Sequence, residues 1–461
     1  MKQQTIRFAA TGARMAAGAV VATACVLGVA GAVAAPWPQV SSDPASTEIT
    51  PVPGDTVLVC DGSFRALGRD SSQADLMVSA ASPRREISGA TDATETAKLE
   101  MPEVTGGEGA IALISRVHDR RTPLIAASES VRLSDDDLTG FAAAPCREPA
   151  LSSWLVGGDV TTGASDIILL TNPGDVTANV DLNVYGESRS ASTVVVPAKT
   201  QLGLPLASVA SGQRSPVVEV VSSGAPVRAT LQSALVRTLD AVGIDLQDGV
   251  PGLQSDQVIL GVQSSPATEG DDSTGMTVRM LSPESDTTAT VRVRATGSAE
   301  VVDEYSVDLP AAVPAEIALA GVPEGVYDIE VEAGAPIVAG VRQTARAGAA
   351  QDFSWALPSP ALTAETETMF SVPPGEPATL YLRNAEEEPV SVELSGDEER
   401  TVRLAPGESA QVPLDAGGHV LEPTGRVHAA IGMRGEKGSA AIAGWPLWPG
   451  AATQQPITVR P

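Results

Sequence analysis

The chain has 461 residues, which is too long for one ordinary domain, and 43% of them are hydrophobic, so packed cores are expected. Gly (43) and Pro (35) are frequent but stay below the level of a disordered chain, and aromatic residues make up only 3%, so the cores must be built from aliphatic side chains. The formal net charge of −27 excludes nucleic acid as an expected partner, because an acidic surface repels phosphate.

The N-terminus predicts export. Residues 1–14 carry Lys2, Arg7 and Arg14 without any acid, and residues 15–35 carry no charge. As a helix, this second segment spans about 30 Å, the thickness of a bilayer core, and the basic side stays in the cytoplasm. Two fates are open: a transmembrane anchor, which we favour because the apolar run exceeds a signal-peptide core, or a signal peptide cleaved after Ala34, which would release the protein. A lipid-modified cysteine at position 25 is the least favoured alternative, because the apolar run continues past it.

Export also determines the expected chemistry of the cysteines. Cys25 lies in the apolar segment, so Cys60 and Cys146 remain and are predicted to form a disulfide. On the loop-entropy model such a bridge stabilises the fold by up to about 4.5 kcal/mol. Two distant thiols supply too few ligands for a metal site, and we expect neither a metal nor a cofactor.

Residues 36–54, rich in Pro and Ser, are expected to form an extended spacer, and residues 55–148 a first β domain of short apolar strands. This domain is expected to contain one short helix. Ser134 is a suitable N-cap, Asp137 can reach back to it, and acidic residues suit a helix start. Asp135 to Asp137 are therefore assigned to a helix opening in preference to a calcium site.

The rest of the chain repeats itself. Gly224–Pro226 and Gly334–Pro336 carry the same Gly-Ala-Pro sequence 110 residues apart, and the turn at Asn172-Pro173 has its counterpart at Ser282-Pro283. About seven short alternating strands fill each period, which is the size of an immunoglobulin-like sandwich. We predict an all-β fold of tandem immunoglobulin-like sandwiches at residues 149–256, 257–350 and 351–461. They are expected to follow one another as separate beads with valines inward and acids outward, and Gly-Ala-Pro is expected at a corner between two late strands.

Three stretches, "APCREPALSSWLVGG", "LLTNPGDVTANVDLNVYGE" and "VVVPAKTQLGLPL", resemble an actinobacterial family of exported, membrane-anchored proteins known only as a domain of unknown function. The resemblance covers roughly residues 53 to 450. Its motifs are turns, so it implies an exported location and no mechanism.

Few residues suggest chemistry. The three histidines fall in different units, and no nucleophile elbow, zinc helix or P-loop is present, so no catalytic residue is assigned. Two groups are candidates for ligand binding. The first is the basic cluster Arg116, Arg120 and Arg121, which competes with a simple solvated loop. The second is Trp445 and Trp448, which flank a proline and are expected to be partly exposed.

We therefore expect a non-enzymatic, exported cell-envelope protein that serves as a binding or scaffold ectodomain, with an envelope protein or cell-wall glycan as partner. An envelope glycan-binding or polysaccharide-assembly accessory protein is the alternative. A hydrolase on a β scaffold is the third hypothesis, and it would need two carboxylates converging in a cleft.

Overall fold

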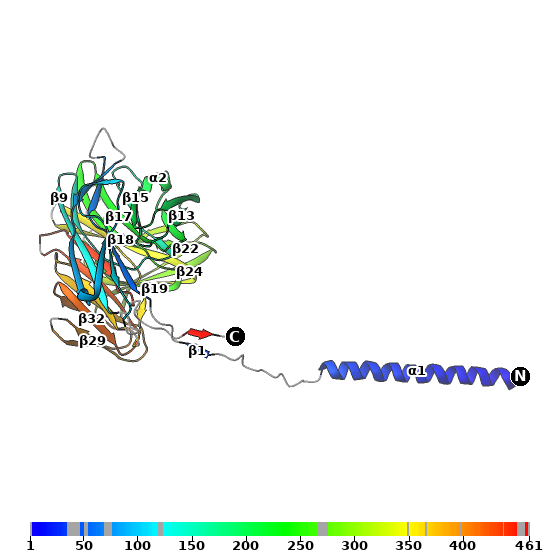
Figure 1. The fold of residues 1–461 in the computed structure, drawn as a ribbon. Helices are drawn as coiled ribbons and strands as arrows, with labels where there is room; N and C mark the ends of the chain where they lie inside the picture. The colour runs from blue at the N-terminus through cyan, green and yellow to red at the C-terminus, as the bar shows by residue number, and fades with distance from the viewer. Residues whose placement is uncertain are drawn as a thin grey trace. The chain divides into compact units, whose positions relative to one another are not determined.

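The computed structural model describes residues 2–34, 47–49, 54–68, 76–118, 123–265, 275–347, 350–364, 367–396, 398–436, 438–449 and 457–459. The chain divides into two units, Met1–Pro51 together with Pro456–Pro461, and Val52–Gln455. The second unit, called the body below, contains the β domains (Figure 1).

In the smaller unit, α1 (Lys2–Ala34) contains most of the uncharged segment that was expected to be helical. Within the described residues, no helix combines the length and apolar character that a membrane crossing requires. Most of the predicted spacer lies outside the described residues. Near its end, β1 (Thr47–Ile49) pairs antiparallel with β35 (Ile457–Val459), so segments close to the two ends of the chain lie side by side.

The second β domain is a sandwich of two antiparallel sheets. Its elements are β11 (Ser152–Leu155), β12 (Ile167–Asn172), β13 (Ala178–Tyr185), β14 (Ser190–Val196), β15 (Thr200–Pro205), α2 (Leu206–Ala210), β16 (Val217–Ser223), β17 (Arg228–Arg237) and β18 (Asp240–Asp248). One sheet has the order β11-β16-β13-β14 and the other β15-β12-β17-β18. Val180 and Leu182 of β13 point inward and pack in one core with Ile168 of the facing sheet, while Asp181 is exposed, as the sequence alternation predicts.

The third domain repeats this arrangement with β19 (Gln254–Ser264), β20 (Thr277–Leu281), β21 (Thr287–Ala295), β22 (Val301–Leu309), β23 (Ala315–Ala318), β24 (Gly325–Ala347) and β25 (Ala350–Ala356). The long strand β24 pairs with β21 as far as Ala333 and with β20 from Val338 onward. Gly334–Pro336 lies where β24 passes from one sheet to the other. The earlier Gly-Ala-Pro lies between β16 and β17, which belong to different sheets, so the predicted corner is confirmed in both places.

The fourth domain consists of β26 (Ala361–Leu362), β27 (Thr368–Val372), β28 (Ala378–Asn384), β29 (Val390–Ser395), β30 (Arg400–Leu404), β31 (Ser409–Leu414), β32 (Gly417–Pro423), β33 (Val427–Arg434) and β34 (Ile442–Pro446). Its sheets have the orders β27-β32-β29-β30 and β26-β33-β28-β31, and β34 also pairs with β33.

The first domain consists of β2 (Thr56–Cys60), β3 (Phe64–Leu67), β4 (Met77–Ala81), β5 (Arg84–Gly89), η1 (Thr91–Ala93), β6 (Thr94–Lys98), β7 (Val104–Thr105), β8 (Ile111–Ser115), β9 (Ile125–Asp135) and β10 (Leu138–Pro145). The helix predicted at Asp135 to Asp137 is wrong, because β9 and β10 form a hairpin in which Leu138 pairs with Asp135. Leu133 and Leu138, on either side of the turn, are buried in a shared core, and that burial outweighs the local capping signals.

The all-β fold of tandem sandwiches is confirmed, but the immunoglobulin-like detail is not. In the second and third domains the first strand pairs with the sixth, and in the fourth domain β26 pairs with β33 and β27 with β32, whereas an immunoglobulin domain pairs its first strand with the second. The third domain also extends to Ala356, beyond the boundary expected at residue 350, because β25 pairs with β24.

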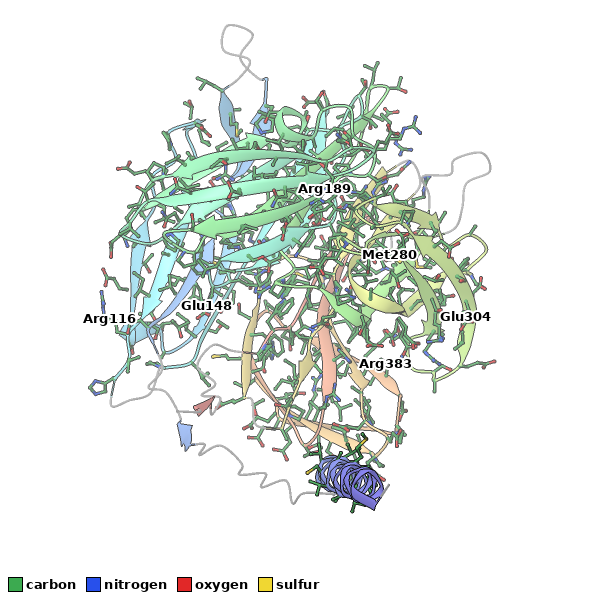
Figure 2. The ribbon with its side chains drawn as sticks, turned by 90° about the vertical axis from the view of Figure 1, so that its right-hand side faces the viewer. Arg116, Glu148, Arg189, Met280, Glu304 and Arg383 are labelled. Atoms are coloured by element: carbon green, nitrogen blue, oxygen red, sulfur yellow. A yellow bond between two sulfur atoms is a disulfide. The ribbon has the colours of Figure 1, made fainter. Side chains whose placement is uncertain are left out.

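The β domains are not separate beads. The last strands of consecutive domains contact one another in a closed cycle: β10 with β18, β18 with β25, β25 with β34, and β34 with β10. Figure 2 shows the third domain around Met280 and Glu304 and the fourth around Arg383 within the same body. The described part of the body is therefore a ring of four β domains that meet at their last strands.

One carboxylate joins the ring at its centre. Asp352 of β25 is buried, and its Oδ2 accepts the backbone N–H of Phe141 at 2.8 Å and of Ile442 at 3.4 Å. Its Oδ1 accepts the N–H of Ile244 at 3.1 Å and that of Phe353 at 3.0 Å. These donors come from β10, β34, β18 and β25, so each domain contributes one N–H to the same side chain. We call this arrangement the Asp352 hub.

The hub needs glycine on two neighbouring strands. Gly140 and Gly243 directly precede the donors on β10 and β18, and both have a φ of 142°. A Cβ at Gly140 would lie 2.6 Å from Oδ1 of Asp352, and a Cβ at Gly243 would lie 2.5 Å from it. Glycine at these positions lets the strands approach the carboxylate closely.

Acidic side chains inside the body contradict the expectation that acids face outward. Asp245 on β18 is buried, and its Oδ2 accepts the N–H of Trp355 at 2.9 Å. Burial raises the pKa of Asp245 to about 7, against the opposing effect of its backbone donors. Burial likewise raises the pKa of Asp166 to about 7. Between pH 3.8 and 7, the folded protein therefore holds protons that the unfolded chain has released.

This difference predicts that the free energy of unfolding falls as the pH rises from 5 to 8. The Asp245→Asn variant keeps a carbonyl acceptor but cannot ionise. Its free energy of unfolding, relative to that of the wild type, should therefore rise by roughly 2 kcal/mol across that range. Urea unfolding at pH 5, 6, 7 and 8 measures the effect, and Asp308→Asn at an exposed position serves as control. A difference in unfolding free energy between Asp245→Asn and the wild type that is the same at all four pH values would contradict the prediction.

Candidate binding cleft

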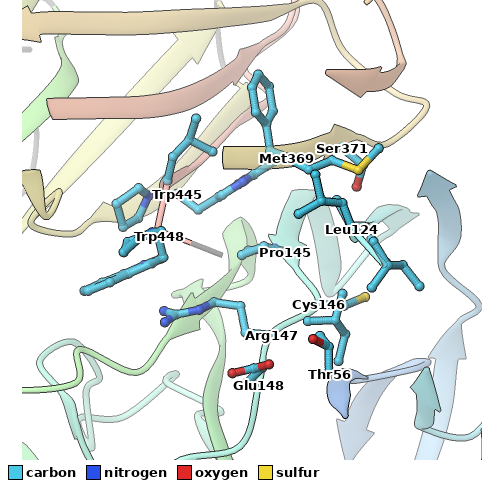
Figure 3. A pocket seen from close by; sticks show the side chains of 18 of the residues that line it. Thr56, Leu124, Pro145, Cys146, Arg147, Glu148, Met369, Ser371, Trp445 and Trp448 are labelled. Carbon is cyan, nitrogen blue, oxygen red and sulfur yellow. The ribbon is translucent and has the colours of Figure 1, made fainter. Parts of the chain in front are cut away.

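A cleft of about 140 Å³ lies between the first and fourth domains (Figure 3). The first domain contributes Leu58 of β2, the beginning of β9 with Ala126, and the segment that leaves β10. The fourth domain contributes Met369 and Ser371 of β27 and the chain that follows β34. We call this feature the Trp448 cleft, and its wall is mostly aliphatic and aromatic.

The cleft contains both predicted tryptophans, in different roles. Trp445 is 4% exposed and packs in the core of the fourth domain, so its expected partial exposure is wrong. Trp448 is half-buried, and the guanidinium of Arg147 lies over its ring at 4.3 Å. The indole Nε1 of Trp448 is buried, and among the described residues it has no hydrogen-bond partner. An acceptor on a bound molecule would satisfy this donor.

A pair of opposite charges borders the apolar wall. Arg147 donates to Oδ2 of the buried Asp248 at 2.8 Å, which fixes the guanidinium between the first and second domains. Glu148 follows in the chain, and desolvation by the surrounding protein raises the pKa of its carboxyl against the opposing charge of Arg147. Figure 3 shows both side chains on the side of the cleft opposite Met369. A ligand in the cleft would thus meet an apolar wall and one side chain of each charge.

The arginine cluster predicted for ligand binding is not part of this cleft. Arg116 is exposed and forms ion pairs with Glu95 at 3.0 Å and with Asp55 at 3.6 Å. These partners match the solvated-loop interpretation. Arg120 and Arg121 lie outside the described residues.

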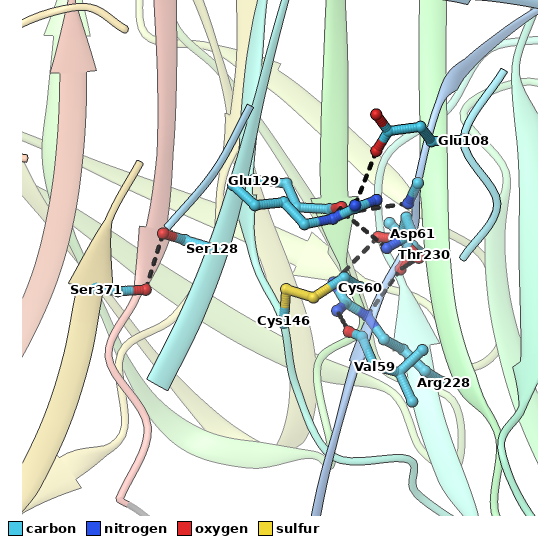
Figure 4. The surroundings of a disulfide bond; sticks show 12 residues. Val59, Cys60, Asp61, Glu108, Ser128, Glu129, Cys146, Arg228, Thr230 and Ser371 are labelled. Atoms are coloured by element: carbon cyan, nitrogen blue, oxygen red, sulfur yellow. Dashed lines mark hydrogen bonds and ion pairs between the residues drawn. A yellow bond between two sulfur atoms is a disulfide. The ribbon is translucent and has the colours of Figure 1, made fainter. Parts of the chain in front are cut away.

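The predicted disulfide is confirmed. Cys60 and Cys146 are bonded and buried, with their Cα atoms 4.5 Å apart (Figure 4). The bridge connects the end of β2 to the residue directly before Arg147, so it holds one wall of the cleft in place. Glu129 has a carboxylate oxygen within 4.8 Å of both sulfurs, and this is a group of residues with the spacing of a metal site. The sulfurs of Cys60 and Cys146 are bonded to each other, and the carboxylate of Glu129 accepts the N–H of Asp61 at 2.8 Å, so these groups are already engaged within the protein.

A buried ion pair next to the disulfide connects the first and second domains. Arg228 of β17 lies 3.2 Å from Oδ2 of Asp61 and also donates to the carbonyl of Val59. Thr230 donates to the other carboxylate oxygen of Asp61 at 3.2 Å (Figure 4). On the opposite side, Ser128 and Ser371 share a hydrogen bond of 2.9 Å that joins the first domain to the fourth. The disulfide region is thus fixed from two neighbouring domains.

Arg147 and Glu148 were not among the residues predicted from the sequence to bind a ligand. The signal was present in "APCREPALSSW", where an Arg-Glu pair follows a cysteine expected to be bridged. A charged pair next to a fixed backbone position is a better candidate than the same pair in a loop.

A family model matches residues 101–415, which is more than half of the chain, and it describes a family of unknown function, DUF5719. The chain belongs to the DUF5719 family. The match confirms the resemblance to a family known only as a domain of unknown function. No curated protein matches the chain. A solved structure described as a tetra-tandem repeat in the extending region of a large adhesion protein is 12% identical, covers 88% of this chain and 96% of its own, and has a TM-score of 0.11. That TM-score is too low to indicate a shared fold.

Proposed function

We propose that this DUF5719 protein is a non-enzymatic, exported binding protein of the cell envelope, and that its partner is another envelope protein that inserts an apolar side chain into the Trp448 cleft. The cleft carries the proposal. Its volume of about 140 Å³ and its aliphatic and aromatic wall suit one apolar side chain. Arg147 and Glu148 are placed to pair with polar groups that flank such a side chain in a partner.

Location and rigidity support the same proposal. A buried disulfide is typical of proteins outside the cytoplasm, and the basic residues before the uncharged segment of α1 suit export. The cleft is formed by two domains that the ring holds together, through Ser128 with Ser371 and through the Asp352 hub. A preformed site loses little entropy on binding. Whether α1 anchors the protein in the membrane or is removed after export does not change the binding proposal.

The alternative partner is a cell-wall glycan. The half-buried ring of Trp448 and its unpaired indole N–H favour it, because sugar hydroxyls accept from such donors. The mostly apolar wall favours a protein side chain over a sugar.

Site-specific photo-crosslinking in intact cells of the source organism tests the proposal. A photoreactive residue at Leu124, on the wall of the cleft, should give one discrete protein adduct, whereas the same residue at the exposed Val195 should not. The Ala126→Leu variant fills the cleft from β9 and should reduce the adduct at least about tenfold. The larger side chain should cost about 1–3 kcal/mol of stability, and thermal unfolding checks that the variant is still folded.

Two results would reject the protein partner. One is an adduct that persists unchanged in the Ala126→Leu variant, because the cleft would not be the contact site. The other is an adduct that resists protease and is removed by glycan-degrading enzymes, which would support the glycan alternative.

A further inference from the structure

A second cavity, of about 320 Å³, lies between the second and third domains. Its second-domain side consists of the segment from Gly158 to Asp166, before β12, of Arg214 and Ser215, before β16, and of β17. Its third-domain side consists of β20, β23, β24 and β25, with Arg279 and Arg342 among the lining residues. We call it the Arg342 cavity. Its volume is at the lower end of the range for small-molecule sites.

Arg279 in this cavity is fully engaged by the protein. Its Nη2 lies 2.7 Å from Glu316, and its Nη1 donates to the carbonyls of Val156 and Gly158 at 3.0 and 2.9 Å. Its guanidinium also lies over the ring of Trp355 at 4.8 Å. Arg279 therefore joins the two domains and has its charge balanced by Glu316.

The charge of Arg342, unlike that of Arg279, is not balanced by an ion pair in the described part of the chain. Its guanidinium lies over the ring of Phe353 at 4.7 Å, which fixes its plane at the cavity wall. Within the described part of the chain, that guanidinium has no hydrogen-bond or ion-pair partner. Burial lowers its pKa, and the like charges of Arg237 and Arg279 act in the same direction. A half-buried cation without a counter-ion destabilises the folded protein because it has lost part of its hydration. An anion bound in the cavity would offset that loss.

The other groups in the cavity limit the charge of such an anion. Asp159 and Asp166 face the same space, and both favour the charged form of Arg342 without contacting it. Asp166 Oδ2 accepts the N–H of Asp159 at 2.7 Å, and Asp159 Oδ1 accepts that of Thr161 at 2.7 Å. These carboxylates disfavour a ligand that carries several anionic groups, but they accept hydrogen bonds from hydroxyl or ammonium groups.

We propose that the Arg342 cavity binds a small molecule with a single oxyanion group, a carboxylate or a phosphate, which pairs with the guanidinium of Arg342 while neighbouring hydroxyl or ammonium groups of the ligand donate to Asp159. The planar guanidinium presents paired donors that match the two oxygens of such a group. The cavity lies in a different interface from the Trp448 cleft, so this site is independent of the proposed protein partner.

Isothermal titration of the full chain tests the site with three probes: glucuronate, inorganic phosphate and uncharged glucose. We expect one equivalent of glucuronate or phosphate to bind at concentrations up to about 10 mM, and glucose not to bind. Binding of glucuronate assigns a carboxylate ligand, and binding of phosphate assigns a phosphate ligand. The absence of binding by both anions, with the protein shown to be folded, would overturn the proposal.

Variants place the binding at Arg342. Arg342→Gln should weaken binding at least about tenfold, and Arg342→Lys should weaken it less, because lysine keeps the charge and loses the paired donors. Arg400→Gln, at an exposed arginine paired with Glu398, should leave it unchanged. Without ligand, Arg342→Gln should unfold at the same or a higher temperature than the wild type, since it removes a half-buried charge that has no counter-ion. Equal affinity of wild type and Arg342→Gln would place the anion elsewhere and overturn the proposal.

Discussion

The Asp352→Ala variant should lose at least about 4 kcal/mol of unfolding free energy, because an unpaired buried N–H costs about 1–3 kcal/mol and Asp352 accepts several. The donors of Phe141, Ile244 and Ile442 belong to three other domains, so the change loosens every neighbour of β25 at the hub. Asp352→Asn keeps one acceptor oxygen and should lose less. Urea unfolding followed by circular dichroism measures both variants.

Hydrogen exchange separates this effect from general destabilisation. In Asp352→Asn, the three interdomain amides should lose protection before amides in the sandwich cores, such as that of Leu182 on β13. The control is Asp308→Ala, an exposed aspartate on β22, which should stay within about 0.5 kcal/mol of the wild type. An Asp352→Ala protein within 1 kcal/mol of the wild type would mean that the hub does not hold the domains together.

Removal of the disulfide should also cause a large loss of unfolding free energy. The double variant Cys60→Ala with Cys146→Ala should lose up to about 4 kcal/mol of unfolding free energy, since the bridge closes a long loop in the unfolded chain. Both sulfurs are buried with Leu58 and Leu113, so alanine leaves no polar group unpaired. Because Cys146 directly precedes Arg147, the fluorescence of Trp448 should also change.

Reductant gives the matched comparison. Dithiothreitol should lower the melting temperature of the wild type toward that of the double variant and should leave the double variant unchanged, which also controls for Cys25. Equal melting temperatures of oxidised wild type and double variant would show that the loop adds no stability.

The predictions that succeeded rest on local chemistry. The alternation in β13, the turn at Asn172 and the Gly-Ala-Pro corners each involve a few consecutive residues. Asn172 illustrates the point: its Oδ1 accepts the N–H of Gly174 at 2.9 Å, a turn that a short sequence fully specifies. The disulfide was predictable because the chain, which was expected to be exported, has one pair of cysteines outside the apolar segment.

The predictions that failed depend on tertiary packing. The turn after Ser134 has the composition of a helix start, but β9 and β10 are buried and pair with each other. Acids were expected to face outward, yet Asp245 of β18 is buried, as is Gln247 on the same strand. Nothing in their own segment distinguishes them from solvent-facing residues, because β18 alternates apolar and polar side chains although both of its faces are buried.

The candidate sites, too, were predicted only as far as their local sequence allowed. The sequence identified Trp445 and Trp448 by residue type, but only the meeting of two domains put Trp448 beside Arg147. Arg342 is one arginine among 26, and its significance depends on the space between two domains.

By itself, the sequence determined the all-β domains, their period of about 110 residues and the covalent link between Cys60 and Cys146. Side-chain alternation and turn residues are properties of short stretches, and the number of cysteines can be counted without a structure. Only the tertiary structure decided that the domains close into a ring around Asp352 and leave cavities between them. The reason is that backbone N–H groups from four distant strands carry no sequence signature of their own, and they become a single site only when the strands are brought together.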